Sequence, residues 1–217
     1  MSIRNLTPTN SRQTLSDLGL LGRSRSYSKS AQLFTAEKAL DRIYIVEKGL
    51  VTLATTTNKG ALITGYRQPG DIIGAEDFLL GTTLPCGISA TCRTACTIAE
   101  VPFDTLHKTA NTDTLMLLGR AAASAAKNAA HQATELAMSE IKERLEGTLK
   151  TITALPTAVT HPRGIKIFHS RQEIAMAVNS SRETVGRLLR MMEDEGAISR
   201  EGHAIIVHAE KPAYRRA

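Results

Sequence analysis

The chain has 217 residues, 42% of them hydrophobic and 22% charged, a composition typical of a folded protein with one or two domains. Its net charge of +6 and isoelectric point of about 9.4 favour polyanionic partners. No segment has the apolar core of a secretory signal or approaches the ~20 apolar residues of a membrane helix, and an odd set of three cysteines (Cys86, Cys92 and Cys96) argues against a disulfide scaffold. We therefore expect a cytoplasmic protein with no membrane partner.

The first hundred residues contain a β-rich region. Residues 1–22 are expected to form a loose arm with a short helix at 14–21, and residues 27–100 alternate short apolar runs with turns. Asn58-Lys-Gly60 is a hairpin signal and Gln68-Pro-Gly-Asp71 is a turn signal. Short strands at regular spacing predict a sandwich or roll. The expected strands are 43–46, 50–54, 61–66, 72–73 and 94–101.

Residues 113–138 are rich in alanine, the residue with the highest helix propensity, and predict one continuous helix. Such a helix is about 38 Å long at 1.5 Å per residue, which is more than one domain of this size buries by itself. Small side chains also let a second helix approach closely. We expect a homodimer through residues 113–138; the alternative is a helix packed on its own β-domain.

The remaining residues predict a helix, a tight turn, a second helix and a β-hairpin. This order is that of a winged helix-turn-helix, whose second helix enters the major groove; a dimer presents two such helices about 34 Å apart. The expected elements are helices at 140–155, 171–178 and 182–195, a hinge near Met138-Ser139, and strands at 165–168, 197–199 and 204–207.

Local capping signals support these helix boundaries. Ser170-Arg-Gln-Glu173 is a capping box that opens the first helix of the pair. Asn179 tolerates the left-handed conformation that a tight turn often needs. Ser181 is expected to cap the second helix, although Ser180 also fits a capping box with Glu183, which would then not be free for a base.

The helix at 182–195 has two faces. Its apolar residues recur at i, i+3, i+4 and i+7: Val185, Leu188, Leu189 and Met192. A second face, offered to solvent, is expected to hold Arg182, Glu183, Gly186 and Arg187. Arginine donates two hydrogen bonds to guanine and glutamate accepts one from cytosine, and the bare glycine permits close approach to a surface. The pattern fits a base-reading helix or a merely solvated charged face; the helix-turn-helix context favours the first.

This region resembles a known family. Ser170-Arg-Gln-Glu-Ile174, Ser181-Arg-Glu-Thr-Val-Gly-Arg187, Glu193-Asp194 and Ile198-Ser199 are similar to the DNA-binding domain of the bacterial regulators that include the cyclic-AMP receptor protein and the FNR-type proteins. The resemblance implies an α+β fold along nearly all of the chain. Its expected parts are a β-roll sensor domain like a cyclic-nucleotide-binding jelly roll (1–110), a dimerisation helix with a hinge (111–139) and a winged helix-turn-helix domain (140–217).

The resemblance also implies partners and contact residues. Double-stranded DNA with a TGTGA-like palindrome would be read by Arg182, Glu183 and Arg187. Its phosphates would be held by Arg171, Gln172, Ser181 and Thr184. The string Ala158-Val-Thr-His-Pro-Arg-Gly164 is similar to the family loop that contacts the α subunit of RNA polymerase, which favours an activator over a repressor. The matching loop residues are Thr160, His161, Pro162 and Gly164.

The effector cassette departs from the family pattern. The family places an arginine at the cyclic phosphate, and that position falls on Cys86, next to Gly87, in a stretch with no Lys or Arg between Arg67 and Arg93. Charge-assisted hydrogen bonds are the strong ones for a buried phosphate. The acid for the ribose could be Glu76, and the hydroxyl pair that meets the base is replaced by Ala129-Ala130. We therefore expect that cyclic AMP is not the effector.

Other sensing chemistries fit the sequence less well or stay open. An FNR-type cluster needs four cysteines, and a haem or metal sensor needs histidine or cysteine ligands, whereas no histidine precedes His107. Cys92 and Cys96 could share one strand face as inert packing. Redox or metal sensing, cyclic di-GMP, another small ligand, or no ligand stay open, and no metal site is predicted. The sequence contains no catalytic motif that would indicate an enzyme. The alternative from another class of function is a dimeric interaction adaptor that does not bind DNA.

Overall fold

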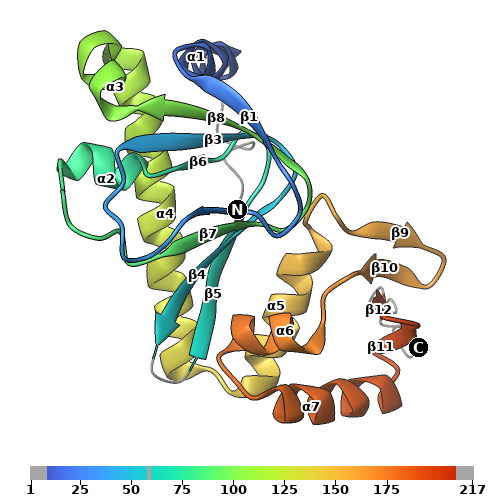
Figure 1. Cartoon of the computed structure of the whole chain (residues 1–217). Coiled ribbons are helices and arrows are strands. Elements are labelled where there is room, and N and C mark those ends of the chain that lie inside the picture. The colour runs from blue at the N-terminus through green and yellow to red at the C-terminus, as the bar shows by residue number, and fades with distance from the viewer. Residues whose placement is uncertain (1–8, 58–59, 209–217) are drawn as a thin grey trace, which may run out of the picture. The chain divides into compact units, whose positions relative to one another are not determined.

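The computed structural model describes residues 9–57 and 60–208 and shows the α+β fold that the sequence predicts (Figure 1). The chain divides into two compact units, residues 1–134 and 135–217. Within the described residues, no helix has the length and apolar character needed to cross a membrane.

The first unit is a β-roll of two four-stranded antiparallel sheets, ordered β1-β8-β3-β6 and β2-β7-β4-β5. Its strands are β1 (Arg23–Tyr27), β2 (Gln32–Phe34), β3 (Arg42–Lys48), β4 (Val51–Thr57), β5 (Gly60–Arg67), β6 (Ile72–Ile73), β7 (Ser89–Cys92) and β8 (Cys96–Pro102). Its helices are α1 (Thr9–Leu20), α2 (Ala75–Leu80), α3 (Phe103–Thr109) and α4 (Thr112–Met138), the last of which continues past residue 134.

Alternation along β8 explains the two apolar cores of the roll. Ala99 and Val101 pack with residues of α1, α3 and α4 on one face of the first sheet. Cys96 and Ile98 point to the opposite face and pack against residues of β4 and β7 from the second sheet. Glu100 has the parity of Cys96 and Ile98, so a carboxylate lies on the face that turns toward the second sheet.

The turn signals agree with the structure where it is described. The Gln68–Asp71 turn closes through a bond from the Asp71 amide to the Gln68 carbonyl (2.9 Å), with Gly70 at φ 95°. β4 and β5 pair antiparallel from Val51↔Arg67 to Thr57↔Gly60, as the hairpin signal predicts, while Asn58 and Lys59 lie outside the described residues. The expected strand at 94–101 starts later, at Cys96.

The long helix is confirmed as α4, and its exposure changes along its length. Thr114, Leu117, Leu118 and Ala121 are buried near its start. From residue 122 onward the side chains are half-buried or exposed, including Ala129 and Ala130, and Met138 is 83% exposed. α4 therefore packs on its own roll mainly through its first three turns.

The second unit is a winged helix-turn-helix. Its four-stranded antiparallel sheet has the order β11-β12-β10-β9. The elements are α5 (Ile141–Thr153), β9 (Val159–His161), β10 (Gly164–Ile167), α6 (Arg171–Val178), α7 (Arg182–Asp194), β11 (Ile198–Glu201) and β12 (Ala204–His208). β11 and β12 form the wing hairpin, and β12 also pairs with β10, so the wing and the β9–β10 turn belong to one sheet.

Candidate DNA interface and effector site

The α6–turn–α7 pair is fixed by caps at both helix starts. The Ser170 hydroxyl accepts from the Glu173 amide (3.2 Å) and the Glu173 carboxylate accepts from the Ser170 amide (2.7 Å), the predicted capping box. Asn179 ends α6 in the left-handed region (φ 52°), again as predicted. Ser181, and not Ser180, is the N-cap of α7. The two helices therefore start where short-range sequence signals place them.

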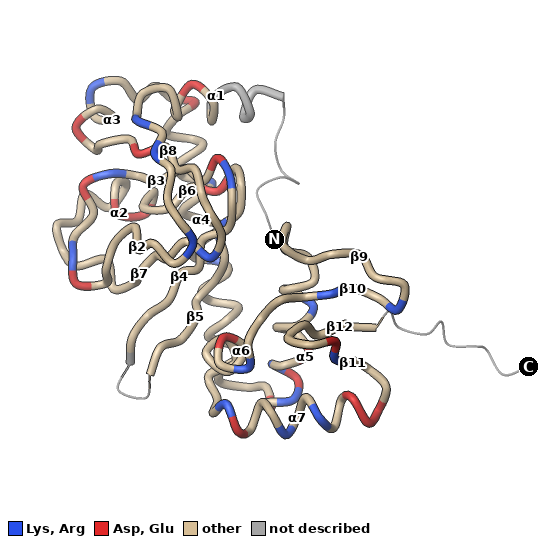
Figure 2. Tube along the Cα trace, turned by 45° about the vertical axis from the view of Figure 1, so that its right-hand side comes forward, with Lys and Arg blue, Asp and Glu red and all other residues tan. Residues whose placement is uncertain are grey.

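The packing of α7 decides which side chains it offers to a ligand. Val185, Leu189 and Met192 are buried, and Leu188 is half-buried. Burial of this stripe leaves Arg182, Glu183 and Arg187 exposed along the other side. Figure 2 shows the arginine (blue) and acidic (red) positions along α7. The three proposed base readers thus lie together on an accessible helix surface.

The proposed phosphate contacts surround the starts of the two helices. Arg171 and Gln172 are exposed in the first turn of α6, after its Ser170 cap. Ser181 is exposed and Thr184 is half-buried; the Ser181 hydroxyl donates to Thr184 Oγ1 (3.0 Å) and accepts from the Thr184 amide (3.0 Å). The two hydroxyls are therefore held as a pair beside the N-terminus of α7, where backbone N–H groups favour anions.

Gly186 corrects the predicted solvent face of α7. It is buried, not offered to solvent. A Cβ built on Gly186 would lie 3.8 Å from Cδ and 3.9 Å from Nη1 of Arg171. The bare backbone is thus covered by the Arg171 side chain from the neighbouring helix, and the close approach that glycine permits is made within the protein.

Arg144 supports the reading helices and was not singled out from the sequence. From α5, its Nε donates to the Val178 carbonyl at the end of α6 (3.1 Å), and its Nη1 donates to the Ser139 carbonyl between α4 and α5. One guanidinium therefore joins the α4–α5 connection to the helix-turn-helix. Bonds from a side chain to distant carbonyls leave no local sequence pattern.

The predicted polymerase loop is the β9–β10 turn. Thr160 and Pro162 are exposed and His161 is half-buried. Gly164 has φ 149°, and a Cβ there would lie 2.0 Å from the Val207 carbonyl oxygen of β12, so the sheet itself requires glycine at this position. The Glu201 carboxylate of β11 faces this turn; its pKa is lowered, first by its hydrogen bond from Lys166.

Cys86 and Gly87, the residues expected near an effector phosphate, donate their backbone amides to carbonyl groups of the protein itself. The Cys86 amide donates to the Lys38 carbonyl (3.2 Å) and the Gly87 amide donates to the Ala36 carbonyl (3.0 Å). The Cys86 thiol donates to the Ile88 carbonyl (3.2 Å), and burial raises its pKa. These groups hold the cassette to the 36–38 segment instead of presenting donors to an anion.

The acidic side of the cassette lies on α2. Glu76 is half-buried and Asp77 is buried, and burial raises the pKa of both carboxyls. The nearby Arg67 acts in the opposite direction on Glu76. Ala129 and Ala130 are exposed on α4 and supply no side-chain polar group. The predicted effector residues therefore offer acids and apolar methyl groups but no cationic side chain.

Cys92 and Cys96 do not share a strand face as expected: Cys92 ends β7 and Cys96 begins β8, in different sheets. Both are buried in the core between the sheets. The pKa of the Cys92 thiol is raised to about 12, first by burial and then by its hydrogen bond with Cys96. Thiolates are the reactive form of cysteine, so the raised pKa of Cys92 disfavours its reactive form at neutral pH. Among the described residues, no group of three or more His, Cys, Asp and Glu is arranged to hold a metal ion.

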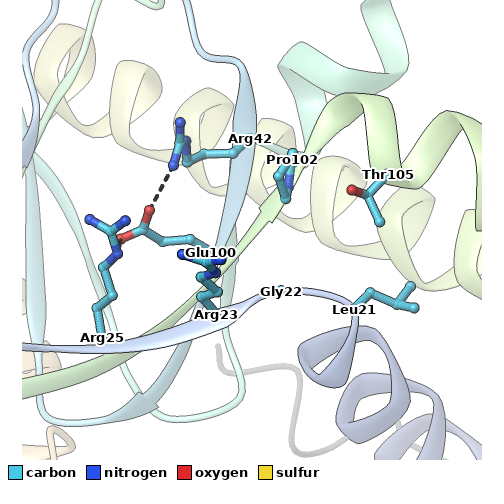
Figure 3. Close-up of a pocket in the computed structure, with 8 residues that line it drawn as sticks. All are labelled: Leu21, Gly22, Arg23, Arg25, Arg42, Glu100, Pro102 and Thr105. Atoms are coloured by element: carbon cyan, nitrogen blue, oxygen red, sulfur yellow. Dashed lines mark hydrogen bonds and ion pairs between the residues drawn. The ribbon is translucent and has the colours of Figure 1, made fainter.

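A pocket of about 280 Å³ opens at one end of the first sheet (Figure 3). Glu100 is only 5% exposed there; its carboxylate accepts from Tyr27 and from Arg42 Nη1 (2.8 Å) and lies 3.6 Å from Arg25 Nε. Arg42 is also bonded to Asp41, and these pairs raise the pKa of its guanidinium. Arg25 and Arg42 thus neutralise a buried carboxylate in this pocket. The lining residues are Leu21, Gly22, Arg23, Arg25, Arg42, Glu100, Pro102 and Thr105.

Two parts of the chain match known domain families. Residues 24–113 match the model of the cyclic nucleotide-binding domain, and residues 143–211 match that of the Crp-like helix-turn-helix domain. The chain is 34% identical over 184 residues to a cAMP-activated global transcriptional regulator CRP of Pasteurella multocida strain Pm70, an alignment that covers 83% of this chain and 87% of that protein. The chain belongs to the CRP/FNR family of transcription regulators.

Solved structures share the fold of this CRP/FNR-family regulator. The c-di-GMP responsive global regulator CLP of Xanthomonas campestris has a TM-score of 0.82 at 23% identity, covering 91% of this chain and 99% of that one. A CRP/FNR-family regulator from Thermus thermophilus has a TM-score of 0.75 at 23% identity, covering 86% and 94%. At this identity the structures show a common fold and nothing finer.

Family membership decides between the classes of function. A CRP/FNR-family member with a Crp-like helix-turn-helix is a DNA-binding transcription regulator and not an enzyme. The adaptor alternative has no support from the comparisons. The match of residues 24–113 to the cyclic nucleotide-binding domain suggests a small effector for the first unit without identifying it.

Proposed function

We propose that the protein is a homodimeric, cytoplasmic activator that binds a TGTGA-like palindrome and responds through its β-roll to an effector other than cyclic AMP. The exposed Arg182, Glu183 and Arg187 on one capped helix are the observation that carries this proposal. Its working parts are residues 1–110 for sensing, 111–139 for dimerisation and hinge, and 140–217 for DNA binding.

Base reading follows from the side chains that α7 exposes. Arg182 and Arg187 each present a guanidinium that fits guanine O6 and N7, and Glu183 accepts from cytosine N4. Arg171, Gln172, Ser181 and Thr184 take phosphates, which fix the register of the helix without specifying sequence. This division matches a helix-turn-helix that enters the major groove at the N-terminal end of its second helix.

Dimerisation is proposed through residues 113–138. After its first three turns α4 exposes a series of small side chains: Ala123, Ala126, Ala129, Ala130 and Ala133. Small residues permit close approach of a second copy of the helix, and two copies would present two reading helices to a palindrome. Activation is proposed through the turn that contains Thr160, His161, Pro162 and Gly164, which would contact the RNA polymerase α subunit.

The proposed effector is not cyclic AMP because the cassette has no cation for a cyclic phosphate. The segment between Arg67 and Arg93 has no Lys or Arg, and its acids Glu76 and Asp77 are already disfavoured as anions by burial. An added phosphate next to them would find no charge-assisted donor within residues 68–92, and the nearby Arg67 already acts on Glu76. Cyclic di-GMP is an alternative to test first, since a protein of the same fold is described as responsive to it.

A mobility-shift titration tests the DNA-reading part of the proposal. The wild-type protein should bind a duplex with two TGTGA half-sites more tightly, by roughly 1,000-fold or more, than one with both half-sites scrambled, the usual range of specific over non-specific binding. The Arg182→Ala/Arg187→Ala double variant should lose this preference while size-exclusion chromatography still shows a dimer. Equal affinity of the wild type for both duplexes would overturn the proposed site.

A further inference from the structure

The wing carries one carboxylate that faces every basic side chain of the β9–β10 turn. Glu201 Oε1 lies 3.1 Å from Lys166 Nζ, and Oε2 lies 3.4 Å from His161 Nε2 and 3.9 Å from Arg163 Nη2. His161 and Arg163 flank Pro162 at the tip of the turn, and Lys166 follows in β10. One side chain from β11 therefore reaches both sides of the turn and the strand behind it.

The turn has further contacts that keep its ends in place but not its tip. Gly164 packs directly against the Val207 carbonyl of β12, and Gly164↔His208 begins the β10–β12 pairing. Lys166 Nζ lies 5.9 Å from the centre of the Phe168 ring, so its ammonium is held between that ring and Glu201. At the tip, the Arg163 amide donates to His161 Nδ1 (3.2 Å), a bond within the turn itself. Among the described residues, Glu201 supplies the ion pairs that join the tip of the turn to the wing.

The basic side chains in this cluster outnumber the single carboxylate of Glu201. Lys166 and Arg163 carry full positive charges, and with Glu201 neutral they would repel each other and any protonated His161. Single exposed ion pairs contribute little, but a network with partly covered members contributes more. Lys166 and His161 are only 21% exposed, whereas Glu201 is 50% exposed. Loss of the one acid should therefore loosen the tip without unfolding the sheet.

We propose that Glu201 is a positioning residue that holds the β9–β10 turn against the wing and so presents the polymerase-contacting surface in one conformation. This inference rests on the proposed role of the turn in activation. The turn and the wing then form one body, so that a protein seated on DNA by α7 presents the turn to its partner in a fixed direction.

Amide hydrogen exchange of the full-length dimer tests the positioning directly. In Glu201→Gln, peptides that cover residues 159–166 should exchange at least threefold faster than in the wild type, and peptides from α7 should be unchanged. Glu193→Gln is the matched control, because Glu193 is an acid of the same unit that pairs with Arg200 of the wing and not with the turn. Equal exchange of 159–166 in Glu201→Gln and the wild type would overturn the proposal.

Transcription in vitro supplies the functional readout. Glu201→Gln should lower activation about fivefold at saturating DNA occupancy, with palindrome affinity within threefold of the wild type, a fivefold change being worth about 1 kcal/mol. Glu201→Asp should recover part of the activation, since it keeps the charge. A loosened turn with full activation would contradict the proposal.

A separate variant distinguishes failure of this proposal from failure of the proposed function. The Thr160→Ala/His161→Ala variant changes the contact surface itself. If it activates like the wild type, the turn is not a polymerase contact and the proposed activating role fails. The exchange rates of Glu201→Gln still decide whether Glu201 holds the turn.

Discussion

The charged side chains of α7 and those of the effector cassette differ in their exposure to solvent. On α7, Arg182, Glu183 and Arg187 are exposed beside a largely buried apolar stripe. In the cassette, Glu76 is half-buried and Asp77 is buried, in a stretch without cations, and burial raises the pKa of both. The first region keeps its charges in water for a polyanionic ligand, whereas the second removes acids from water without supplying a partner for an anion.

This difference indicates that the two regions are under separate constraints. By our proposal, Arg182, Glu183 and Arg187 keep the family pattern, so the same half-site is expected. The proposed sensing residues depart from that pattern, although they belong to a roll with two ordered sheets and two apolar cores. A shared architecture can therefore carry one retained and one altered site, and each can be tested by itself.

The largest expected effect is on the DNA-reading side. Arg182→Ala should weaken binding to the TGTGA palindrome by about 1–3 kcal/mol for each half-site, because a bidentate contact to guanine is lost. Fluorescence anisotropy at fixed salt would measure this change. Arg190→Ala is the matched control, an exposed arginine on the same helix beyond the proposed contacts, and should stay within threefold of the wild type. Equal losses in the two variants would show that α7 contributes charge but does not read bases.

Substitutions beside the buried Glu100 of the roll should lower the unfolding free energy and leave DNA binding unchanged. Arg42→Met removes the closest cation of the buried Glu100, and breaking such a pair in a partly exposed setting should cost about 2 kcal/mol of unfolding free energy. Arg25→Met, whose arginine is 57% exposed, should cost only about 0.5 kcal/mol. Urea unfolding followed by circular dichroism gives both values. Similar costs would mean that Arg42 has no special part in neutralising Glu100.

Gly186 offers a smaller and more selective test of the reading head. Gly186→Ala should raise the unfolding free energy by up to about 1 kcal/mol, since alanine favours the helix and its Cβ meets Arg171 only at ordinary contact distance. Palindrome affinity should stay within threefold, because the covered position does not face DNA. A tenfold loss of affinity with intact stability would restore the idea that DNA approaches this glycine directly.

The smallest effect is expected at alkaline pH, again in the roll. The pKa of Tyr27 is raised to about 12 from its ordinary value of 10, first by burial and then by its hydrogen bond to Glu100. A raised pKa means that folding favours the neutral phenol, so its contribution is complete below pH 10 and is lost between pH 10 and 12. Wild-type stability should fall more steeply than that of Tyr27→Phe over this interval, measured by urea unfolding at each pH. Parallel curves would contradict the role of Tyr27.

The elements with local signals were predictable from the sequence. Ser170, Asn179 and Ser181 act on residues three or four positions away, which is why both ends of α6 and the start of α7 lie where the sequence indicates. β1 was missed because Arg23-Ser-Arg-Ser-Tyr27 has no apolar alternation and pairs with β8 far along the chain. Its assignment depends on a non-local partner that no short pattern reveals.

The site residues that escaped prediction also depend on long-range contacts. The bonds to Glu100 span 73 residues from Tyr27 and 58 from Arg42. Helical spacing predicts a solvent-facing Gly186 because this residue lies four positions from Arg182. It also lies three positions from the buried Leu189. The Arg171 side chain on the neighbouring helix decided between the two faces, and helical spacing alone contains no information about it.

By our proposal, a DNA-reading domain of the family type is joined to a sensor domain that does not use cyclic AMP. The test is a titration of the TGTGA palindrome with the full-length dimer, with and without saturating cyclic AMP and with cyclic di-GMP in a parallel series. We expect sequence-specific binding whose affinity changes less than about twofold when cyclic AMP is added. A tenfold or greater gain with cyclic AMP would contradict it and would mean that the cassette binds the cyclic phosphate without a cation from residues 68–92.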